Sequence, residues 1–120
     1  MPQSFSRVII TSSENLRKGE LMAKLTVLYG HPTDSTSFDE YYADHHLPLV
    51  EKIPNLRHFE AGKVIATPDG SGRPYYLIAE LWFESVEQLQ SSMSSSEGRA
   101  AAEDLQNFAT GGATLFISET

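Results

Sequence analysis

The sequence contains no cysteine. This absence excludes disulfide bonds, thiol nucleophiles and metal sites built from thiolates. Apolar runs of membrane-spanning length are also missing, and the first residues lack the apolar stretch and cleavage site of a secretory signal. We therefore expect a cytoplasmic protein that has no membrane partner.

Basic residues are scarce. Nine lysines and arginines stand against sixteen aspartates and glutamates, and the formal net charge is −7. We expect no nucleic-acid partner, because phosphate binding requires clustered Lys and Arg side chains. The length of 120 residues suits one small domain with a hydrophobic core.

The first 21 residues are polar and show no sustained periodicity, whereas a strand pattern begins directly after Met22. We expect residues 1–21 to be an extension of a domain that spans 22–120. Two origins stay open for it: a disordered tail, or a misassigned translation start with Met22 as the true first residue. A purine-rich string that resembles a bacterial ribosome-binding site can encode Lys18-Gly19-Glu20, which favours the second origin.

Segments rich in β-forming residues predict four strands, at 24–29, 56–66, 74–84 and 113–118. Helical spacing predicts a helix from about 38 to 50, capped by Ser35 or Ser37. A second helical region begins at the cap Ser85 and ends at 108, with a weak break in its serine-rich middle. The order β-α-β-β-α-β predicts an α+β, ferredoxin-like sandwich with a four-stranded antiparallel sheet.

The predicted strand at 74–84, PYYLIAELWFE, is apolar on both faces. Alternation sorts its residues into two sets: Tyr75, Leu77, Ala79, Leu81 and Phe83 on one face, and Tyr76, Ile78, Glu80 and Trp82 on the other. Two helices cover one face of such a sheet, and an apolar patch left on the other usually marks an interface or a ligand site. We expect a second copy of the chain to cover it, which makes the protein a homodimer.

The segment FDEYYADHHLPLV at 38–50 resembles the EthD family, named for ethyl tert-butyl ether degradation, of the dimeric α+β barrel proteins. The resemblance rests on Phe38, Asp39, Tyr41, Tyr42, His46, Pro48 and Leu49 in the first helix of a βαββαβ unit. It implies that two sheets pack face to face into a barrel, with a cleft that binds a ligand. Relatives in the wider superfamily include cofactor-free monooxygenases, isomerases and polyketide cyclases, so the fold does not select one reaction.

His46 is the best candidate for a reactive group, with Tyr42 as its partner. The two residues are four positions apart, which brings their side chains together on one face of a helix. A histidine beside a phenol is suited to moving protons on an enolisable or phenolic substrate. The competing interpretation is structural, in which His46 caps the helix end or binds a core carbonyl.

Five further residues are candidates for binding the substrate: Tyr29, Asp39, His45, Glu80 and Trp82. Each also has a plain structural interpretation. Asp39 is favourable in the first turn of a helix, and the aromatic residues suit a core or dimer interface. His45 points about 100° away from His46 and is expected to stack near Tyr41. Glu80 is expected to pair with Arg57 or Lys63, or to have a raised pKa.

No cofactor or metal is expected. The histidines lack the H-x-H and H-x-x-x-H spacings of metal sites, and the glycines form no phosphate loop or nicotinamide fingerprint. Two functions therefore compete. One is a cofactor-independent enzyme that isomerises, cyclises or oxygenates a hydrophobic or aromatic small molecule by proton transfer. The other is a non-catalytic protein that binds such a metabolite or assists a partner oxygenase.

Overall fold

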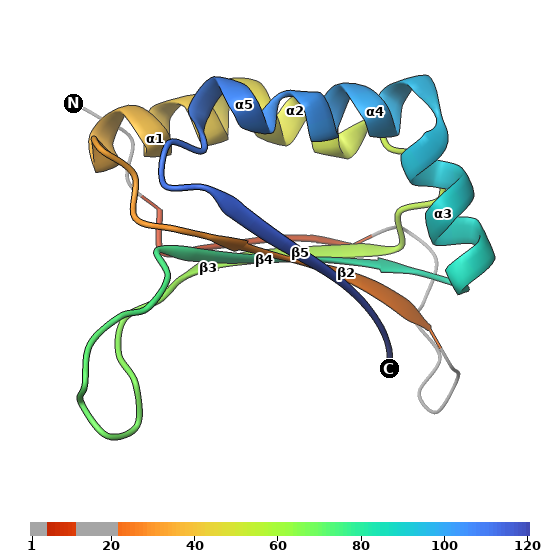
Figure 1. The fold of residues 1–120 in the computed structure, drawn as a ribbon. Helices are drawn as coiled ribbons and strands as arrows, with labels where there is room; N and C mark the ends of the chain where they lie inside the picture. The colour runs from red at the N-terminus through yellow and green to blue at the C-terminus, as the bar shows by residue number, and fades with distance from the viewer. Residues whose placement is uncertain (1–4, 12–21) are drawn as a thin grey trace.

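An antiparallel sheet forms one layer of the structure, and the helices form a second layer on one of its faces (Figure 1). The computed structural model describes residues 5–11 and 22–120. The strands are β1 (Arg7–Thr11), β2 (Ala23–Tyr29), β3 (His58–Lys63), β4 (Leu77–Phe83) and β5 (Ala113–Glu119). The helices are α1 (Ser35–Tyr41), the π-helix η1 (Tyr42–His46), α2 (Leu47–Glu51), α3 (Val86–Ser94), α4 (Ser96–Glu103) and α5 (Leu105–Phe108).

The strand order is β1-β3-β4-β2-β5, with every neighbouring pair antiparallel. The predicted ferredoxin-like α+β fold is confirmed by strands β2 to β5 and the helices between them. The sheet is nevertheless five-stranded, because β1 adds to the edge of β3 through pairs such as Val8 with Ala61. The sequence did not predict β1, because a pattern of five residues is too short to be recognised as a strand among polar neighbours. Residues 1–4 and 12–21 lie outside the described residues, so the origin of the 1–21 segment stays a prediction.

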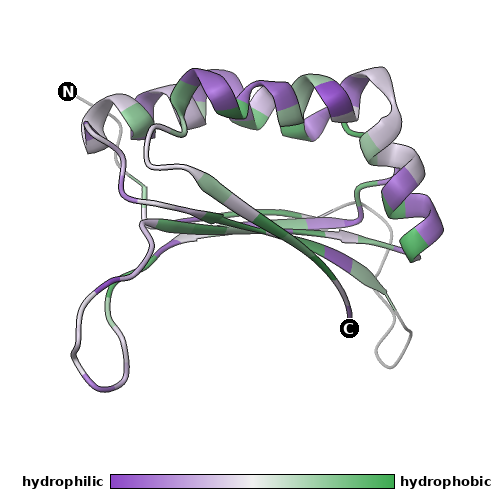
Figure 2. Cartoon of the chain, in the orientation of Figure 1, coloured by the Kyte–Doolittle hydropathy of each residue, from purple (hydrophilic) through white to green (hydrophobic). Residues whose placement is uncertain are grey.

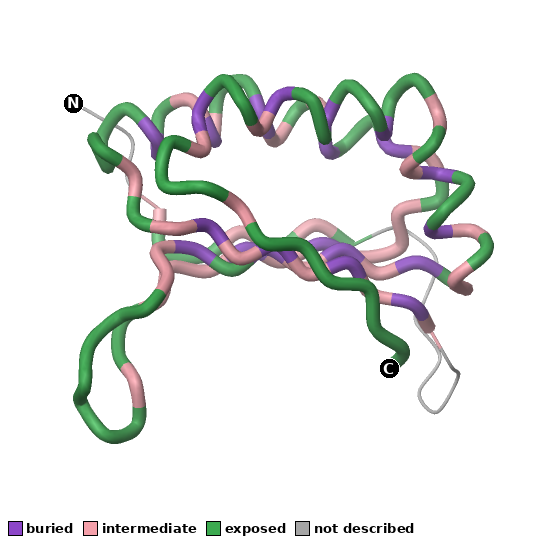
Figure 3. The backbone as a smooth tube through the Cα atoms, viewed as in Figure 1, coloured by how far each residue is buried: buried purple, intermediate pink, exposed green. Residues whose placement is uncertain are grey.

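The two faces of the sheet differ in burial. Alternate residues of β4 are buried beneath the helices, namely Leu77, Ala79, Leu81 and Phe83. Ile78, Glu80 and Trp82 lie on the open face, as predicted. Figure 3 shows the same alternation along the central strands, and Figure 2 shows hydrophobic residues along much of the sheet. Tyr76 departs from the prediction, because it precedes β4 and donates a hydrogen bond to Asp39 of α1, on the helical side.

The N-cap of the first helical segment is neither of the predicted residues Ser35 and Ser37. Asp34 is its N-cap, and Asp34 Oδ1 accepts a hydrogen bond from the amide of Ser37 at 3.1 Å. The later cap at Ser85 is confirmed, since its side chain accepts from the amide of Gln88 at 3.0 Å. The expected serine-rich break falls at Ser95, which caps α4 by accepting from the amide of Gly98.

The π-helix η1 separates α1 from α2 and has a local cause. Proline has no amide proton, and its ring crowds the carbonyl four residues earlier. Pro48 therefore disfavours the regular α-helical pattern around Asp44. The amide of Leu47 instead bonds the carbonyl of Tyr42, five residues back. This wider turn keeps the helical segment continuous through Pro48 into α2 and determines how the side chains of Tyr42 and His46 are oriented.

Candidate active site

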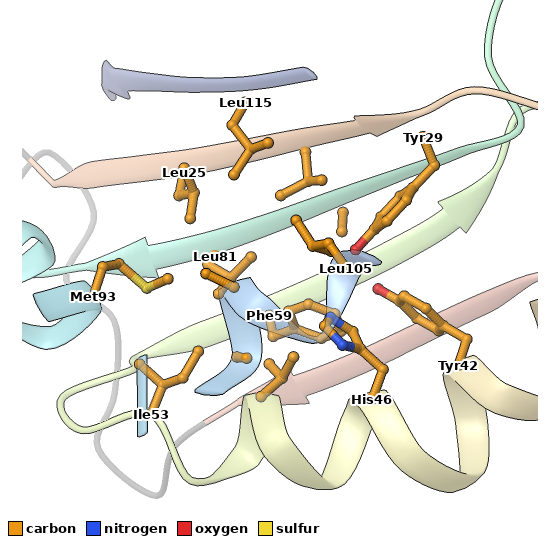
Figure 4. Close-up of a pocket in the computed structure, with 15 residues that line it drawn as sticks. Leu25, Tyr29, Tyr42, His46, Ile53, Phe59, Leu81, Met93, Leu105 and Leu115 are labelled. Atoms are coloured by element: carbon orange, nitrogen blue, oxygen red, sulfur yellow. The ribbon is translucent and has the colours of Figure 1, made fainter. Parts of the chain in front are cut away.

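A cavity of about 30 Å³ lies between the helices and the buried face of the sheet (Figure 4). It is lined by residues from strands β2, β3, β4 and β5 and from most of the helices: Leu25, Val27, Tyr29, Tyr42, His46, Val50, Ile53, Phe59, Ala79, Leu81, Met93, Ala101, Ala102, Leu105 and Leu115. Only Tyr29, Tyr42 and His46 bring oxygen or nitrogen atoms in their side chains to this wall. The polar groups are therefore concentrated at one end of an apolar space.

The π-helix places Tyr42 and His46 at that end together. Tyr42 is 0% exposed and His46 is 4% exposed. Their ring centroids are 5.3 Å apart, and Phe108 of α5 packs on the imidazole with its centroid at 4.7 Å. The pairing expected from their four-residue spacing is thus present, although the turn that carries it is wider than an α-helix.

Asp104, between α4 and α5, holds the imidazole. Its Oδ2 lies 2.9 Å from His46 Nδ1, and the carboxyl is 7% exposed. Its other oxygen, Oδ1, accepts hydrogen bonds from the Tyr41 hydroxyl at 2.6 Å and the Asn107 amide at 2.9 Å. The carboxylate can only accept, so Nδ1 is the protonated nitrogen of a neutral His46. Nε2 then keeps its lone pair, and it has no hydrogen-bond partner within residues 5–11 and 22–120.

For both His46 and Asp104, burial and the polar contacts shift the pKa in opposite directions. Burial lowers the pKa of His46, the Asp104 carboxylate opposes that effect, and the net result is below the ordinary 6.5. Burial raises the pKa of Asp104, but hydrogen bonds from Tyr41, Asn107 and His46 outweigh it and the net pKa is lowered. At neutral pH the pair is therefore a neutral imidazole oriented by a carboxylate, which is the form of a general base.

This arrangement makes stability depend on pH. Because the pKa of His46 is below 6.5 in the folded state, the unfolded chain binds more protons between that lowered value and 6.5. The free energy of unfolding should fall as the pH drops below about 6.5, by no more than about 1.4 kcal/mol per pH unit for this one group. Urea unfolding at several pH values measures this fall in the free energy of unfolding. The fall should shrink in His46→Gln and persist in the control His31→Gln; an identical pH profile in His46→Gln would contradict the assignment.

Two phenols face each other beside the histidine. In Figure 4 the hydroxyls of Tyr29, on β2, and Tyr42, on η1, point toward one another. Tyr42 Oη is buried and has no hydrogen-bond partner in the described part of the chain. Burial raises the pKa of Tyr29, although the neighbouring Tyr42 hydroxyl lowers it in part. Burial raises the pKa of Tyr42 as well, and the Tyr29 hydroxyl beside it adds to that rise. Both phenols are therefore protonated at neutral pH and able to donate hydrogen bonds.

The remaining predicted binding residues lie away from this cavity wall. Asp39 is buried on α1, where it pairs with Lys63 at 2.8 Å and accepts from Tyr76 at 2.7 Å. His45 is exposed and packs on Tyr41 as expected, with ring centroids 4.8 Å apart. Neither residue lines the cavity that contains His46.

Glu80 and Trp82 lie on the open face of the sheet, on the opposite side from His46. The expected partners of Glu80 were wrong: it pairs with Lys24 at 2.9 Å, because β2 is its neighbouring strand in that register. Arg57 pairs instead with Glu84. Lys24 also lies over the Trp82 ring, with its nitrogen 5.3 Å from the centroid.

Sequence reasoning missed Asp104, the residue that orients His46. The two are 58 residues apart, and no local motif links them. A signal was nonetheless present. Ala101, Asp104, Leu105 and Phe108 recur at helical spacing, which places Asp104 on the apolar stripe of its helix. A carboxylate on a buried stripe needs a partner, and a buried histidine is a natural one.

Residues 30–112, which are more than half of the chain, match the model of the EthD domain family. The chain belongs to the EthD family. The predicted resemblance is thus confirmed by a family match that includes His46 and Asp104.

Two relatives share substantial sequence identity with this EthD chain. An uncharacterised 11.0 kDa protein in the thcB-thcC intergenic region of Rhodococcus erythropolis is 41% identical over 98 residues, 82% of this chain and 94% of that protein. The crystal structure of an EthD family protein from Bacillus halodurans C-125 is 38% identical with a TM-score of 0.77, covering 82% of this chain and 98% of that one.

A more distant structure shares the fold alone. It is a dimeric ferredoxin-like protein of unknown function from Thermobifida fusca YX, 14% identical with a TM-score of 0.65, covering 91% of this chain and 100% of that one. Within the described residues of this EthD chain, no helix is long and apolar enough to cross a membrane. The same residues contain no group of three or more histidines and carboxylates arranged to hold a metal ion.

Proposed function

We propose that this EthD protein is a cofactor-independent enzyme that moves a proton on a small hydrophobic or aromatic molecule. The cavity of about 30 Å³ holds about two water molecules, so its lining side chains move apart to admit the substrate. His46 acts as the acid and base through Nε2, and Tyr42 contacts the substrate beside it. Asp104 is a positioning residue that acts through His46. The observation that carries this proposal is the buried His46–Asp104 pair, 2.9 Å apart, at the one polar end of an apolar cavity.

The arrangement supports proton transfer for three reasons. A base must be neutral at the working pH, and the lowered pKa of His46 provides that. It must be oriented, and Asp104 supports Nδ1 while leaving Nε2 without a partner in the described chain. It must also be shielded from bulk water, and both side chains are almost fully buried.

Tyr29 completes the polar end of the cavity, and we retain it as a substrate-binding residue. Asp39, His45, Glu80 and Trp82 stay predictions for contacts beyond this wall. We also propose a homodimer, since a fold relative is described as dimeric. The open face offers apolar side chains to such a partner, including Ile9, Ile78 and Phe116, which are exposed in the single chain. A cytoplasmic location remains part of the proposal.

The test is deuterium exchange into cyclohexanone, a small ring with weakly acidic hydrogens beside its carbonyl. In D₂O the wild-type protein should accelerate exchange above the buffer rate, as measured by mass spectrometry. His46→Gln should return the rate to that of buffer, whereas His31→Gln, which removes a histidine outside the cavity lining, should not change it. Equal exchange in wild type and His46→Gln would rule out His46 as the base.

A second candidate is a non-catalytic binding or accessory protein, and the mostly apolar lining favours it. Container proteins hold ligands by apolar contact with a few polar groups for orientation. This function predicts that the wild-type protein is stabilised against heat by a small aromatic ligand but catalyses no exchange. The His46→Gln variant would then change the affinity alone.

A further inference from the structure

We propose that Tyr29 and Tyr42 form a pair of hydrogen-bond donors for the oxygen of an uncharged carbonyl substrate, so that the substrate class is small, apolar ketones and related enolisable compounds. This inference deepens the proposed function and rests on it. It is carried by the unpartnered Tyr42 hydroxyl at the cavity wall and by the Tyr29 hydroxyl that faces it (Figure 4).

The Tyr42 hydroxyl is a buried polar group that lacks a hydrogen-bond partner in the described residues. A buried polar group without a partner destabilises the fold, and such groups are rare in native proteins. Tyr42 is 0% exposed and its Oη has no partner in the described residues. The other polar groups on the wall are Tyr29, whose hydroxyl faces Tyr42, and His46, and neither forms a hydrogen bond with Tyr42 Oη. An oxygen atom of a molecule bound between the two phenols would satisfy both hydroxyls. Phenylalanine would fill the same volume without this cost, which argues that the hydroxyl has a use.

Charge narrows the class of ligand. The residues that line the cavity include no lysine or arginine. The Asp104 carboxylate lies behind His46, 2.9 Å from its Nδ1, and repels a carboxylate or phosphate ligand. Both phenols remain protonated because burial raises their pKa. Two neutral donors in an apolar space suit a neutral carbonyl oxygen that gains negative charge during the reaction.

The position of the base completes the site. His46 and Tyr42 lie on one turn of η1 with ring centroids 5.3 Å apart, and Tyr29 approaches from β2. A ketone places its acidic C–H bond and its oxygen on neighbouring carbons. One molecule can therefore direct its C–H bond to His46 Nε2 and its oxygen to the phenols.

The reaction step balances without a further reagent. Nε2 takes the proton from the carbon beside the carbonyl, and the electron pair of that C–H bond becomes a carbon–carbon double bond. The carbonyl π electrons move to the oxygen, which becomes an enolate oxygen accepting hydrogen bonds from Tyr42 and Tyr29. Return of a proton from the imidazolium to carbon restores the ketone, or delivers an isomer when it reaches a different carbon.

The experiment uses 4-fluorophenol, a planar analogue of the cyclohexanone enol, and follows its binding by ¹⁹F NMR. Wild type should bind it, and Tyr42→Phe should weaken binding about tenfold by removing one hydrogen bond. The same variant should slow cyclohexanone exchange about 10²-fold, as loss of an oxyanion donor does. Tyr29→Phe should act in the same direction. Tyr75→Phe, which removes a phenol outside the cavity lining, should match wild type in both measurements.

The outcomes separate the two proposals. Loss of exchange in His46→Gln with unchanged exchange and binding in both tyrosine variants would overturn the donor pair but keep the base. Absence of exchange in wild type, with phenol binding that requires Tyr42, would overturn the enzyme proposal but keep the donor pair as a binding site. Failure of wild type to bind 4-fluorophenol would overturn the assigned ligand class.

Discussion

Replacing Asp104 with asparagine should slow His46-dependent exchange about 10⁴-fold, as loss of the orienting carboxylate does in other histidine-based sites. Tyr41 and Asn107 both donate to Oδ1 of Asp104, so the asparagine keeps its oxygen toward them. Its NH₂ group then faces His46 Nδ1 and donates to it. The imidazole proton moves to Nε2, which can no longer accept a proton from the substrate.

The NMR signals of the imidazole nitrogens distinguish this effect from simple unfolding. They should report protonated Nδ1 in wild type and protonated Nε2 in Asp104→Asn, with the fold retained. Glu103→Gln changes the neighbouring, exposed carboxylate and should leave both the tautomer and the exchange rate unchanged. A variant with wild-type exchange and a shifted tautomer would contradict the role of Asp104.

Replacing Phe108 with alanine should lower the free energy of unfolding by about 3–5 kcal/mol, the range for a buried phenylalanine. Phe108 is 5% exposed. Its ring centroid lies within 6 Å of five other rings, those of Tyr29, Phe38, Tyr41, Tyr42 and His46. Truncation leaves a void next to the imidazole that this rigid aromatic cluster cannot readily fill.

Urea unfolding measures the loss, at one fixed protein concentration because association adds to apparent stability. Ile65→Ala is the control: Ile65 is 83% exposed, and its truncation should change the free energy of unfolding by less than about 0.5 kcal/mol. Equal effects of the two substitutions would show that the aromatic cluster is not the core of the domain.

Local patterns predicted the helices and the four main strands because each of these elements has periodicity, caps or turn residues of its own. Ser85 and the break near Ser95 are examples, since their side chains bond amides three residues away. The strand β1 was not predicted, because five residues carry little periodicity and its stability comes from pairing with β3, about 50 residues later.

The candidate site was likewise predicted only in part, for the residues that lie close together in the sequence. Tyr42 and His46 were predicted as a pair because both lie on one helical turn. Asp104 was missed and the partner of Glu80 was wrong, since both contacts depend on which segments the tertiary fold brings together. The position of Tyr29 in the cavity follows from strand alternation, whereas its approach to Tyr42 required the packing of η1 on β2.

The π-helix also makes the site sensitive to the length of the chain. A π turn holds one more residue than an α turn over the same hydrogen-bonded loop. Deleting a single residue within 42–46 would allow a regular α-helix, turning the segment before the deletion by about 100° relative to α2. That turn would move Phe38 out of the core and Asp39 away from Lys63 of β3. Loss of one codon would therefore remove the His46 arrangement and the packing of α1 together.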